Sequence, residues 1–587
     1  MYQYDEDQPT PNFLHDVAKG VIWDSEPLNI FGFNRLVGTT FETLWDDGGN
    51  YVYPSSALVM NASSSSAADT MDVLIVGLDS SYNEIRETVT LSGVTPVSTS
   101  ASFLRINSAV ILAGSNVGKS MIVAGLCRAF SARGLKVLPF KPQNMSNNAS
   151  VTADGGEIGR AQAMQAMACR VNPIIDMNPV LLKPETEVGA QVIVQGQRLT
   201  TVKARDYAQL KPTLMPRVME SFNRLAKEAD LIIVEGAGSP AETNLRAGDI
   251  ANMGFAEAAN IPVILVGDID RGGVIAQLVG TYSILDSKDL SRIKGFMINK
   301  FRGDVTLFDG GLADIINHTK WPSMGVLPWF NNAGYLPAED ASDIKPKSTG
   351  KGFKVVVPKL SRIANFDDLD PLSADPNISV EIISPGQPLP LDSDLMLLPG
   401  TKSTIGDLKF FREQGWDIDL AAYVRAGGQV LGICGGYQML GQEIVDSEGI
   451  EGTPGKHKGL GHLDVVTEMH AEKRLAIVSG TDLISGASVD GYEIHIGQTS
   501  GNDCNNHWLI MNNNKTGAAS ADGKIQGCYI HGLFSSDGFR QNYLERIGAN
   551  IAKSEYSVKV EKTLNDLAIH MEENCDLDQI LRIASEK

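Results

Sequence analysis

The chain has 587 residues, of which 43% are hydrophobic and 7% aromatic, and its formal net charge is -20. This length exceeds what one hydrophobic core supports and predicts three or four domains. The negative charge argues against nonspecific nucleic-acid binding, and the sequence has no run of about 18 apolar residues that could span a membrane. The segment Met1–Asp7 lacks the basic and then apolar order of a signal peptide. We therefore expect a cytoplasmic protein that binds neither nucleic acid nor a membrane.

The cysteines give no sign of a disulfide framework or a zinc site. They are scattered, without a Cys-x-x-Cys spacing or a cysteine-histidine cluster. The six positions are Cys127, Cys169, Cys434, Cys504, Cys528 and Cys575. No sequence feature indicates an oligomeric state.

Residues 1–105 differ in composition from the rest of the chain. They hold 14 acidic and 4 basic residues, so half of the net charge lies here. A serine-rich tract at 61–68 precedes two β-like segments, at 73–78 and 87–93. We expect a small β-rich module of unknown role, which loosely resembles β-rich virion structural modules of tailed phages.

From residue 106 the pattern changes to strands that alternate with helices. Near-continuous apolar strands are expected at 109–112, 135–139, 230–234, 261–266 and 293–298. This alternation predicts a doubly wound parallel sheet with helices on both faces. A polar stretch at 338–352 predicts a linker, and a second α/β unit begins at Phe353.

The sequence thus divides into four parts, with boundaries at 1–105, 106–340, 352–552 and 553–587. In the last part, Leu564, Leu567 and Met571 recur at helical spacing. This spacing predicts a packed amphipathic helix in the C-terminal tail.

A glycine-rich turn follows the strand expected at 109–112. Gly114-Ser-Asn-Val-Gly-Lys-Ser120 precedes a helical run, and this order is typical of a P-loop. Gly114, Asn116 and Gly118 would cradle phosphates with backbone amides. Lys119 would reach the β- and γ-phosphates, and the Ser120 hydroxyl would bind Mg²⁺.

Charged residues follow two of the neighbouring strands. Glu235 ends the strand at 230–234, so its carboxylate lies at the sheet edge where α/β proteins bind ligands. Lys141 and Glu157 follow the strand at 135–139. Alone, each would be a solvated surface group, but beside a P-loop they describe a site for phosphate and a hard cation. We expect Lys141 to contact the nucleotide and Ser120 to bind Mg²⁺, and Glu235 is a candidate ligand of the same ion.

A second site is predicted where Gln429–Ile433, a short apolar strand, meets a helical run. Cys434 occupies the turn between them, with Gly432, Gly435 and Gly436 around it. This is the pattern of a nucleophile elbow, in which small neighbours allow a strained turn. The Gly435 amide would then face an oxyanion. The alternative is a buried structural cysteine between packing glycines.

A cysteine nucleophile needs a base, and nine histidines are available. His531 follows a β-like segment and precedes a glycine turn, about a hundred residues after Cys434, and we expect it to be the base. The main competitor is His495, which could instead shape the mouth of the substrate pocket. Gly400 ends another strand and could supply the second oxyanion amide.

Taken in order, the motifs from residue 106 to about 550 resemble the glutamine-hydrolysing cobyric acid synthase family of cobalamin biosynthesis. The motifs that carry this resemblance are Gly114–Ser120, Phe140–Ser146, Gly156–Gln162, Val234–Pro240, Asp268–Gly273, Leu398–Ser403, the Cys434 elbow, Gly491–His495 and Tyr529–Gly532.

The resemblance implies a fold and an activity. Residues 106–340 would be a dethiobiotin-synthetase-like ATP-binding amidoligase domain, and residues 352–552 a class I glutamine amidotransferase domain. With ATP, Mg²⁺ and glutamine, the enzyme would amidate the b, d, e and g carboxylates of adenosylcobyrinic acid a,c-diamide. Asn299 would recognise adenine, and Glu157 and Glu235 would hold Mg²⁺. Residues 1–105 have no counterpart in the family.

Two departures from the family pattern stand out. Three residues, not four, separate Gly114 from Gly-Lys-Ser, Ala113 replaces the expected glycine, and the loop is about two residues shorter than in the family. Position 533 is leucine where the full glutaminase triad has His-x-Glu, although the family generally resembles a cysteine-histidine pair.

Two other functions stay open. Cobyrinic acid a,c-diamide synthase is a related amidase that acts on other carboxylates, and Phe140–Met145 favours cobyric acid synthase over it. A noncatalytic assembly or binding protein, using the N-terminal module, is the alternative from another class.

Overall fold

The computed structural model describes the strands of residues 58–111 and then residues 118–184, 189–337, 352–551 and 555–585. The chain divides into two compact units, Met1–Ser115 and Asn116–Lys587. Each unit is described by itself.

The first unit contains strands that pair antiparallel. These strands are β1 (Leu58–Ala62), β2 (Asp72–Leu78), β3 (Glu84–Thr90), β4 (Val97–Phe103) and β5 (Arg105–Ile111). One sheet has the order β3-β2-β5 and the other pairs β1 with β4. One predicted strand is wrong: residues 109–111 do not enter a parallel sheet, because Ala109, Val110 and Ile111 pair antiparallel with β2.

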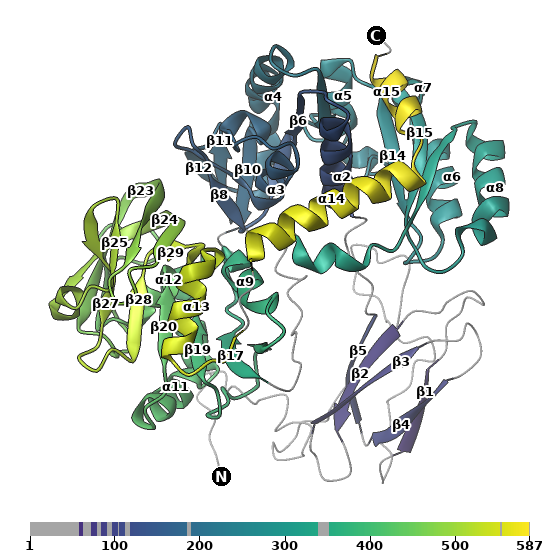
Figure 1. Ribbon diagram of the computed structural model, residues 1–587. Helices are drawn as coiled ribbons and strands as arrows, with labels where there is room; N and C mark the ends of the chain where they lie inside the picture. Colours follow the sequence, from purple (N-terminus) through teal and green to yellow (C-terminus); the bar gives the residue numbers. More distant parts are fainter. Residues whose placement is uncertain are drawn as a thin grey trace. The chain divides into compact units, whose positions relative to one another are not determined.

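The nucleotide-binding half of the second unit has parallel strands in two groups (Figure 1). The strands are β6 (Val137–Phe140), β13 (Leu231–Val234), β14 (Val263–Asp268), β15 (Ile293–Phe301) and β16 (Ser323–Pro328). β6 pairs with β13, and β14, β15 and β16 form the other group. No described strand lies between β13 and β14. An apolar cavity of about 410 Å³ lies there, and its lining includes Ile232, Val234, Ile264 and Val266.

Helices surround these strands, and this alternation confirms the predicted α/β fold. They are α2 (Lys119–Ala132), α3 (Arg160–Ala168), α4 (Ala204–Ala226), α5 (Met253–Ala259), α6 (Val274–Ile284), α7 (Ser287–Arg292) and α8 (Asp309–Thr319). A side sheet has the order β12-β11-β10-β7, beside a small hairpin, β8–β9. The bounds are β7 (Gln143–Met145), β8 (Ala149–Val151), β9 (Glu157–Gly159), β10 (Val180–Pro184), β11 (Gly189–Val194) and β12 (Gln197–Lys203).

The second α/β domain has a continuous central sheet in the order β18-β17-β19-β20-β28-β27. All its pairs are parallel except β27 with β28. The strands are β17 (Phe353–Pro358), β18 (Ile378–Ile383), β19 (Leu395–Leu398), β20 (Val430–Ile433), β27 (Ala518–Ala519) and β28 (Ile525–Cys528). Its helices are α9 (Asp370–Ser373), α10 (Thr404–Glu413), α11 (Trp416–Arg425), α12 (Gly435–Leu440) and α13 (Asp537–Arg546).

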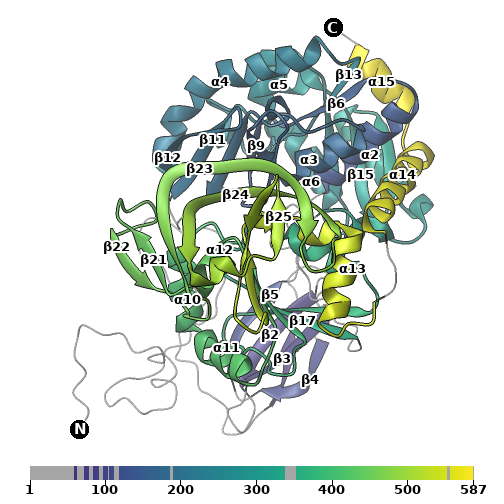
Figure 2. The ribbon, with the colours of Figure 1, turned by 60° about the vertical axis from the view of Figure 1, so that its left-hand side comes forward.

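A second sheet of this domain carries a long hairpin, β23–β24, which Figure 2 shows near β8 to β12 of the other half. Its strands are β21 (Glu443–Asp446), β22 (Gly455–Lys458), β23 (Val465–Asp482), β24 (Ser488–Gly501), β25 (Leu509–Met511), β26 (Asn514–Thr516) and β29 (Ile530–His531). Ala149, Val151, Leu181 and Ile193 form a buried cluster with Tyr492 and Ile494 of β24. The two halves therefore share an apolar interface.

The C-terminal tail forms α14 (Tyr556–Asn574) and α15 (Leu577–Ser585), and α14 packs along α2 (Figure 1). Leu564, Leu567 and Met571 are fully buried, which confirms the predicted amphipathic helix. A Cβ at Gly125 of α2 would lie 2.8 Å from Met571 Cγ, so the helices need glycine there. The tail thus returns the chain to the nucleotide-binding half.

Candidate active site

Cys434 lies in a strained turn between β20 and α12. Its backbone has φ 52° and ψ -108°, a conformation that non-glycine residues rarely adopt outside functional sites. A Cβ at Gly436 would lie 2.1 Å from the Leu398 carbonyl oxygen, so the glycine is needed for the close approach of α12 to β19. The Cys434 thiol donates to the Ile494 carbonyl at 3.7 Å. The strand, strained cysteine and helix form the geometry of a nucleophile elbow.

His531 is bonded to a carboxylate that the sequence analysis missed. Its Nδ1 donates to Asp368 Oδ2 at 2.7 Å, and Asp368 Oδ1 accepts from the Gly532 amide at 2.6 Å. Burial opposes protonation of His531, but the charge and hydrogen bond of Asp368, with a contribution from Cys434, raise its pKa to about 10. Cys434, His531 and Asp368 thus have the arrangement of nucleophile, base and orienting acid.

Asp368 replaces the missing glutamate of the His-x-Glu pattern from elsewhere in the chain. It lies in a 3-10 turn, Phe366–Leu369, whereas Leu533 is fully buried in the core. One signal could have revealed it: an acidic pair, Asp367 and Asp368, shortly after β17, at the carboxyl edge of the parallel sheet.

The two residues predicted to form the oxyanion site lie close to the elbow. Gly435 begins α12, and the first amides of a helix lack intrahelical acceptors. A Cβ at Gly400 would lie 2.7 Å from His531 Cε1, and one at Gly435 would lie 2.5 Å from Thr401 Cγ2. Both glycines therefore border the reacting groups, and their role as donors stays a prediction.

His495 has a different environment from His531. Its ring stacks on Tyr529 with centroids 3.7 Å apart, and Nδ1 donates a hydrogen bond to the Gly497 carbonyl at 3.2 Å. Burial, with smaller contributions from Arg474 and His531, lowers its pKa to about 3. A neutral, stacked imidazole is a weak base at neutral pH, which supports His531 as the base.

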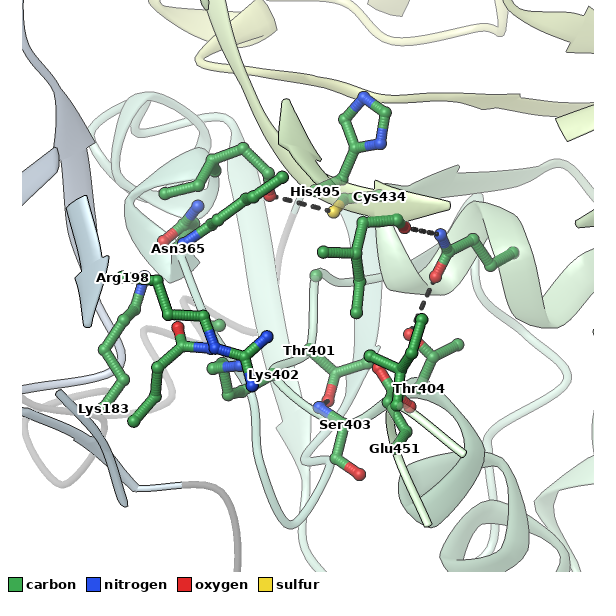
Figure 3. A pocket seen from close by; sticks show the side chains of 18 of the residues that line it. Lys183, Arg198, Asn365, Thr401, Lys402, Ser403, Thr404, Cys434, Glu451 and His495 are labelled. Carbon is green, nitrogen blue, oxygen red and sulfur yellow. Dashed lines mark hydrogen bonds between the residues drawn. The ribbon is translucent and has the colours of Figure 1, made fainter. Parts of the chain in front are cut away.

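A cavity of about 260 Å³ opens at Cys434 and has walls from both halves (Figure 3). The larger wall comes from the domain of Cys434 and includes Thr401, Glu451 and His531. Lys183 of β10 and Arg198 of β12 line it from the nucleotide-binding half. Pockets for drug-sized ligands span about 300–1,000 Å³, so this volume suits a smaller molecule such as an amino acid.

Glu157, predicted to bind Mg²⁺, lies at this interface between two lysines. It is almost fully buried, with Lys183 Nζ 2.8 Å from Oε2 and Lys473 of β23 bonded to Oε1. Burial opposes ionisation of Glu157, but the two lysines outweigh it and lower its pKa to about 2. Burial also lowers the pKa of Lys473, to about 7, against the charge of Glu157. This environment does not resemble that of Glu235, and the metal role of Glu157 stays a prediction.

The other predicted metal-site residues do lie together. Ser120 Oγ donates to Glu235 Oε1 at 2.9 Å, and Lys141 Nζ lies 2.8 Å from the same oxygen. Gln165 donates to the second Glu235 oxygen at 2.6 Å. A hydroxyl and a carboxylate are the ligands that Mg²⁺ uses together with nucleotide phosphates. The donor set of Ser120 and Glu235 thus fits the ion.

The rest of the predicted phosphate site is described in part. Gly114 and Asn116 lie outside the described residues. Gly118 has φ 79°, and Lys119 Nζ donates to the Gly238 carbonyl at 3.4 Å. Asn299 of β15 is buried against Gly118, where a Cβ would lie 2.6 Å from Asn299 Nδ2. Asn299 therefore borders the expected nucleotide site, and adenine recognition stays a prediction.

Two family models match the chain, one in each half. A CobQ/CobB/MinD/ParA nucleotide binding domain matches residues 109–342, and a CobB/CobQ-like glutamine amidotransferase domain matches residues 354–539. The chain is 61% identical over 472 residues to a cobyric acid synthase of Rhodobacter capsulatus, covering 80% of this chain and 98% of that one. It belongs to the cobyric acid synthase family. Cobyric acid synthases of Ruegeria sp. and Bradyrhizobium diazoefficiens are 59% and 56% identical, covering 80% of this chain and 97% and 98% of theirs.

Membership of the cobyric acid synthase family confirms the resemblance drawn from the motifs. The chain is an enzyme of cobalamin biosynthesis with a glutamine amidotransferase domain and a nucleotide-binding domain. Neither family model includes residues 1–105. Among the described residues, no helix combines the length and apolar character needed to cross a bilayer.

Proposed function

We propose that this enzyme uses ATP and the ammonia of glutamine to amidate the b, d, e and g carboxylates of adenosylcobyrinic acid a,c-diamide. The observation that carries the glutamine-dependent half is the buried set Cys434, His531 and Asp368 beneath an amino-acid-sized cavity. The Ser120–Glu235 pair at the start of the P-loop helix supports the ATP-dependent half. Six free cysteines agree with a cytoplasmic location.

In the glutaminase domain, His531 holds the proton taken from the Cys434 thiol, and the resulting thiolate attacks the amide carbon of glutamine. Asp368 holds the imidazole through Nδ1, so that Nε2 faces the reacting atoms. His531 then protonates the departing ammonia, and water hydrolyses the thioester to release glutamate. The Gly435 and Gly400 amides are the candidates to stabilise the oxyanion.

In the nucleotide-binding domain, Lys119 and the loop amides bind the phosphates of ATP, and Ser120 and Glu235 hold Mg²⁺. The bound ion neutralises charge on the transferring phosphoryl group. A substrate carboxylate accepts the γ-phosphoryl group, and ammonia displaces phosphate from the resulting acyl phosphate. Charge stabilisation and positioning, without a protein nucleophile, carry this half.

The test is a Cys434→Ser variant supplied with ATP, Mg²⁺ and the corrinoid diamide. We expect it to lose amidation with glutamine and to retain amidation with ammonium salts, because the two reactions use different domains. Loss of both activities would contradict this division of labour. Product mass from the wild-type enzyme gives the number of carboxylates amidated, and a diamide product from cobyrinic acid would indicate the a,c-diamide synthase instead.

A further inference from the structure

The cavity at Cys434 has a cation on the wall that the other domain supplies. This inference rests on the proposed hydrolysis of glutamine. When the glutamine amide reaches Cys434, the α-carboxylate at the far end of the molecule needs a positively charged partner, because a carboxylate that leaves water without one is costly. Five basic side chains line the cavity besides His531, namely Lys183, Arg198, Lys402, Lys473 and His495.

Most of these groups already have a different task. Lys183 and Lys473 both bind the buried carboxylate of Glu157. Lys402 interacts electrostatically with Glu451. Burial raises the pKa of Glu451 to about 7, and the charge of Lys402 opposes this rise. His495 is neutral, as its lowered pKa shows. These four groups are therefore poor candidates for a substrate carboxylate.

Arg198 differs from the other four. It is exposed on β12, and its Nη2 donates a hydrogen bond to the Thr201 hydroxyl at 3.3 Å. Among the residues that the structure describes, no carboxylate lies within ion-pair distance of Arg198. Figure 3 shows its guanidinium extending into the cavity, toward the loop that carries Thr401 and Lys402.

We propose that Arg198 binds the α-carboxylate of glutamine, so that the glutamine site is complete only when both domains contribute. A guanidinium offers two parallel N–H donors that match the two oxygens of a carboxylate. Cys434 and His531 supply the chemistry from one domain, and Arg198 supplies recognition of the amino-acid end from the other. Glutamine therefore binds at the interface between the glutaminase domain and the nucleotide-binding domain.

Several contacts hold Arg198 at the cavity. β12 pairs with β11 through the register Ile193↔Arg198, and Ile193 is buried in the apolar interface with Tyr492 and Ile494. Ion pairs from Glu157 to Lys473 and from Arg160 to Asp367 join the domains nearby. The β11–β12 hairpin is thus held against the glutaminase domain by apolar contacts, and ion pairs join the two domains nearby.

The test compares Arg198→Ala and Arg198→Lys with the wild-type enzyme, using ammonia release from two substrates. One substrate is glutamine, and the other is 4-aminobutanamide, which has the same amide and lacks the α-carboxylate. We expect Arg198→Ala to raise KM for glutamine about 10- to 100-fold, the effect of a lost charge-assisted hydrogen bond. Arg198→Lys recovers part of that loss, and hydrolysis of 4-aminobutanamide stays at the wild-type rate.

Arg217→Ala is the matched control. Arg217 is an exposed arginine of the same domain that pairs with Glu220 on α4 and does not line the cavity. We expect wild-type KM for glutamine in this variant. A wild-type KM in Arg198→Ala would overturn the inference, and so would an equal loss with both substrates, because that would indicate a distorted pocket. A wild-type enzyme that releases no glutamate from glutamine would instead overturn the proposed function.

Discussion

The sequence of each half places an apolar segment before a glycine-rich stretch and a helix, and the two halves differ in how the apolar segment pairs. In the glutaminase domain, β20 lies between β19 and β28, so the sheet fixes the strand that leads into the Cys434 turn. In the nucleotide-binding domain, α2 begins at Lys119, but residues 105–111 pair with β2 of the N-terminal unit. The space between β13 and β14 is an apolar cavity.

This difference teaches that a turn motif and the sheet that holds it are separate requirements. The strand before Cys434, β20, pairs with β19 on one side and with β28 on the other. Val110 and Ile111 can lie in an antiparallel strand or in a parallel one, because β-branched apolar residues suit both. The following predictions test whether the glutaminase half is complete and what the nucleotide-binding half needs.

The largest effect is expected for Asp368→Asn. This change keeps the shape of the side chain. It removes the charge that orients His531 and stabilises its protonated form. Glutamine hydrolysis should fall roughly 10²- to 10⁴-fold, while amidation with ammonium salts continues. Glutamate release and product mass measure the two activities. Unchanged glutamine hydrolysis would mean that Cys434 and His531 act as a pair without an orienting acid.

The same variant changes the pH dependence of stability. A histidine whose pKa rises from about 6.5 when unfolded to about 10 in the folded enzyme stabilises the fold fully below pH 6.5. This stabilisation is lost as the pH rises toward 10. We expect the wild-type enzyme to lose more stability between pH 6.5 and 9.5 than Asp368→Asn does. Unfolding by urea at the two pH values measures the difference.

The next effect concerns the nucleotide-binding half alone. Lys119→Met removes the cation expected at the β- and γ-phosphates, and amidation with ammonium salts should fall roughly 10²- to 10³-fold. Glutamine hydrolysis without ATP should stay near the wild-type rate. Lys136→Met, an exposed lysine of the same domain that pairs with Glu228, serves as control. Equal effects of the two lysine changes would contradict the P-loop assignment.

A smaller effect is expected from two glycine changes. In Gly436→Ala, the new Cβ meets the Leu398 carbonyl oxygen of the backbone, and such overpacking costs about 1–3 kcal/mol of the free energy of unfolding. In Gly310→Ala, on α8, the Cβ meets no atom within 4 Å, and alanine should stabilise the helix by up to about 1 kcal/mol. Chemical unfolding of both variants, with glutamate release, measures the contrast.

The smallest effect is expected when residues 1–104 are deleted. Residues 109–111 can pair in one sheet at a time, and the deletion removes β2, their partner in the N-terminal unit. Family members match 97–98% of their own length to 80% of this chain, so they function without such a module. We expect ATP affinity at or above that of the full chain, measured by calorimetry. A tenfold loss of affinity would show that the N-terminal module supports the nucleotide site.

Much of the architecture could be predicted because it depends on local patterns. The apolar strands from residue 135 onward and the helix at Leu564–Met571 were found where periodicity placed them. The elbow was predictable because strand, cysteine and glycines are consecutive. Asp368 was not, since it lies 163 residues from its partner His531 and folding alone joins them. The placement of residues 109–111 failed for a related reason: strand pairing is a long-range choice that a short apolar segment does not encode.

Asp367 and Asp368 are consecutive residues with different obligations. Asp368 binds the imidazole of His531, and Asp367 binds Arg160 of the other domain and accepts a hydrogen bond from Tyr492, whose ring stacks on His531. Two consecutive residues therefore contact the nucleotide-binding domain and the proposed base. If the domains parted, Asp367 would lose its ion pair with Arg160, and the turn that carries both carboxylates would lose an anchor.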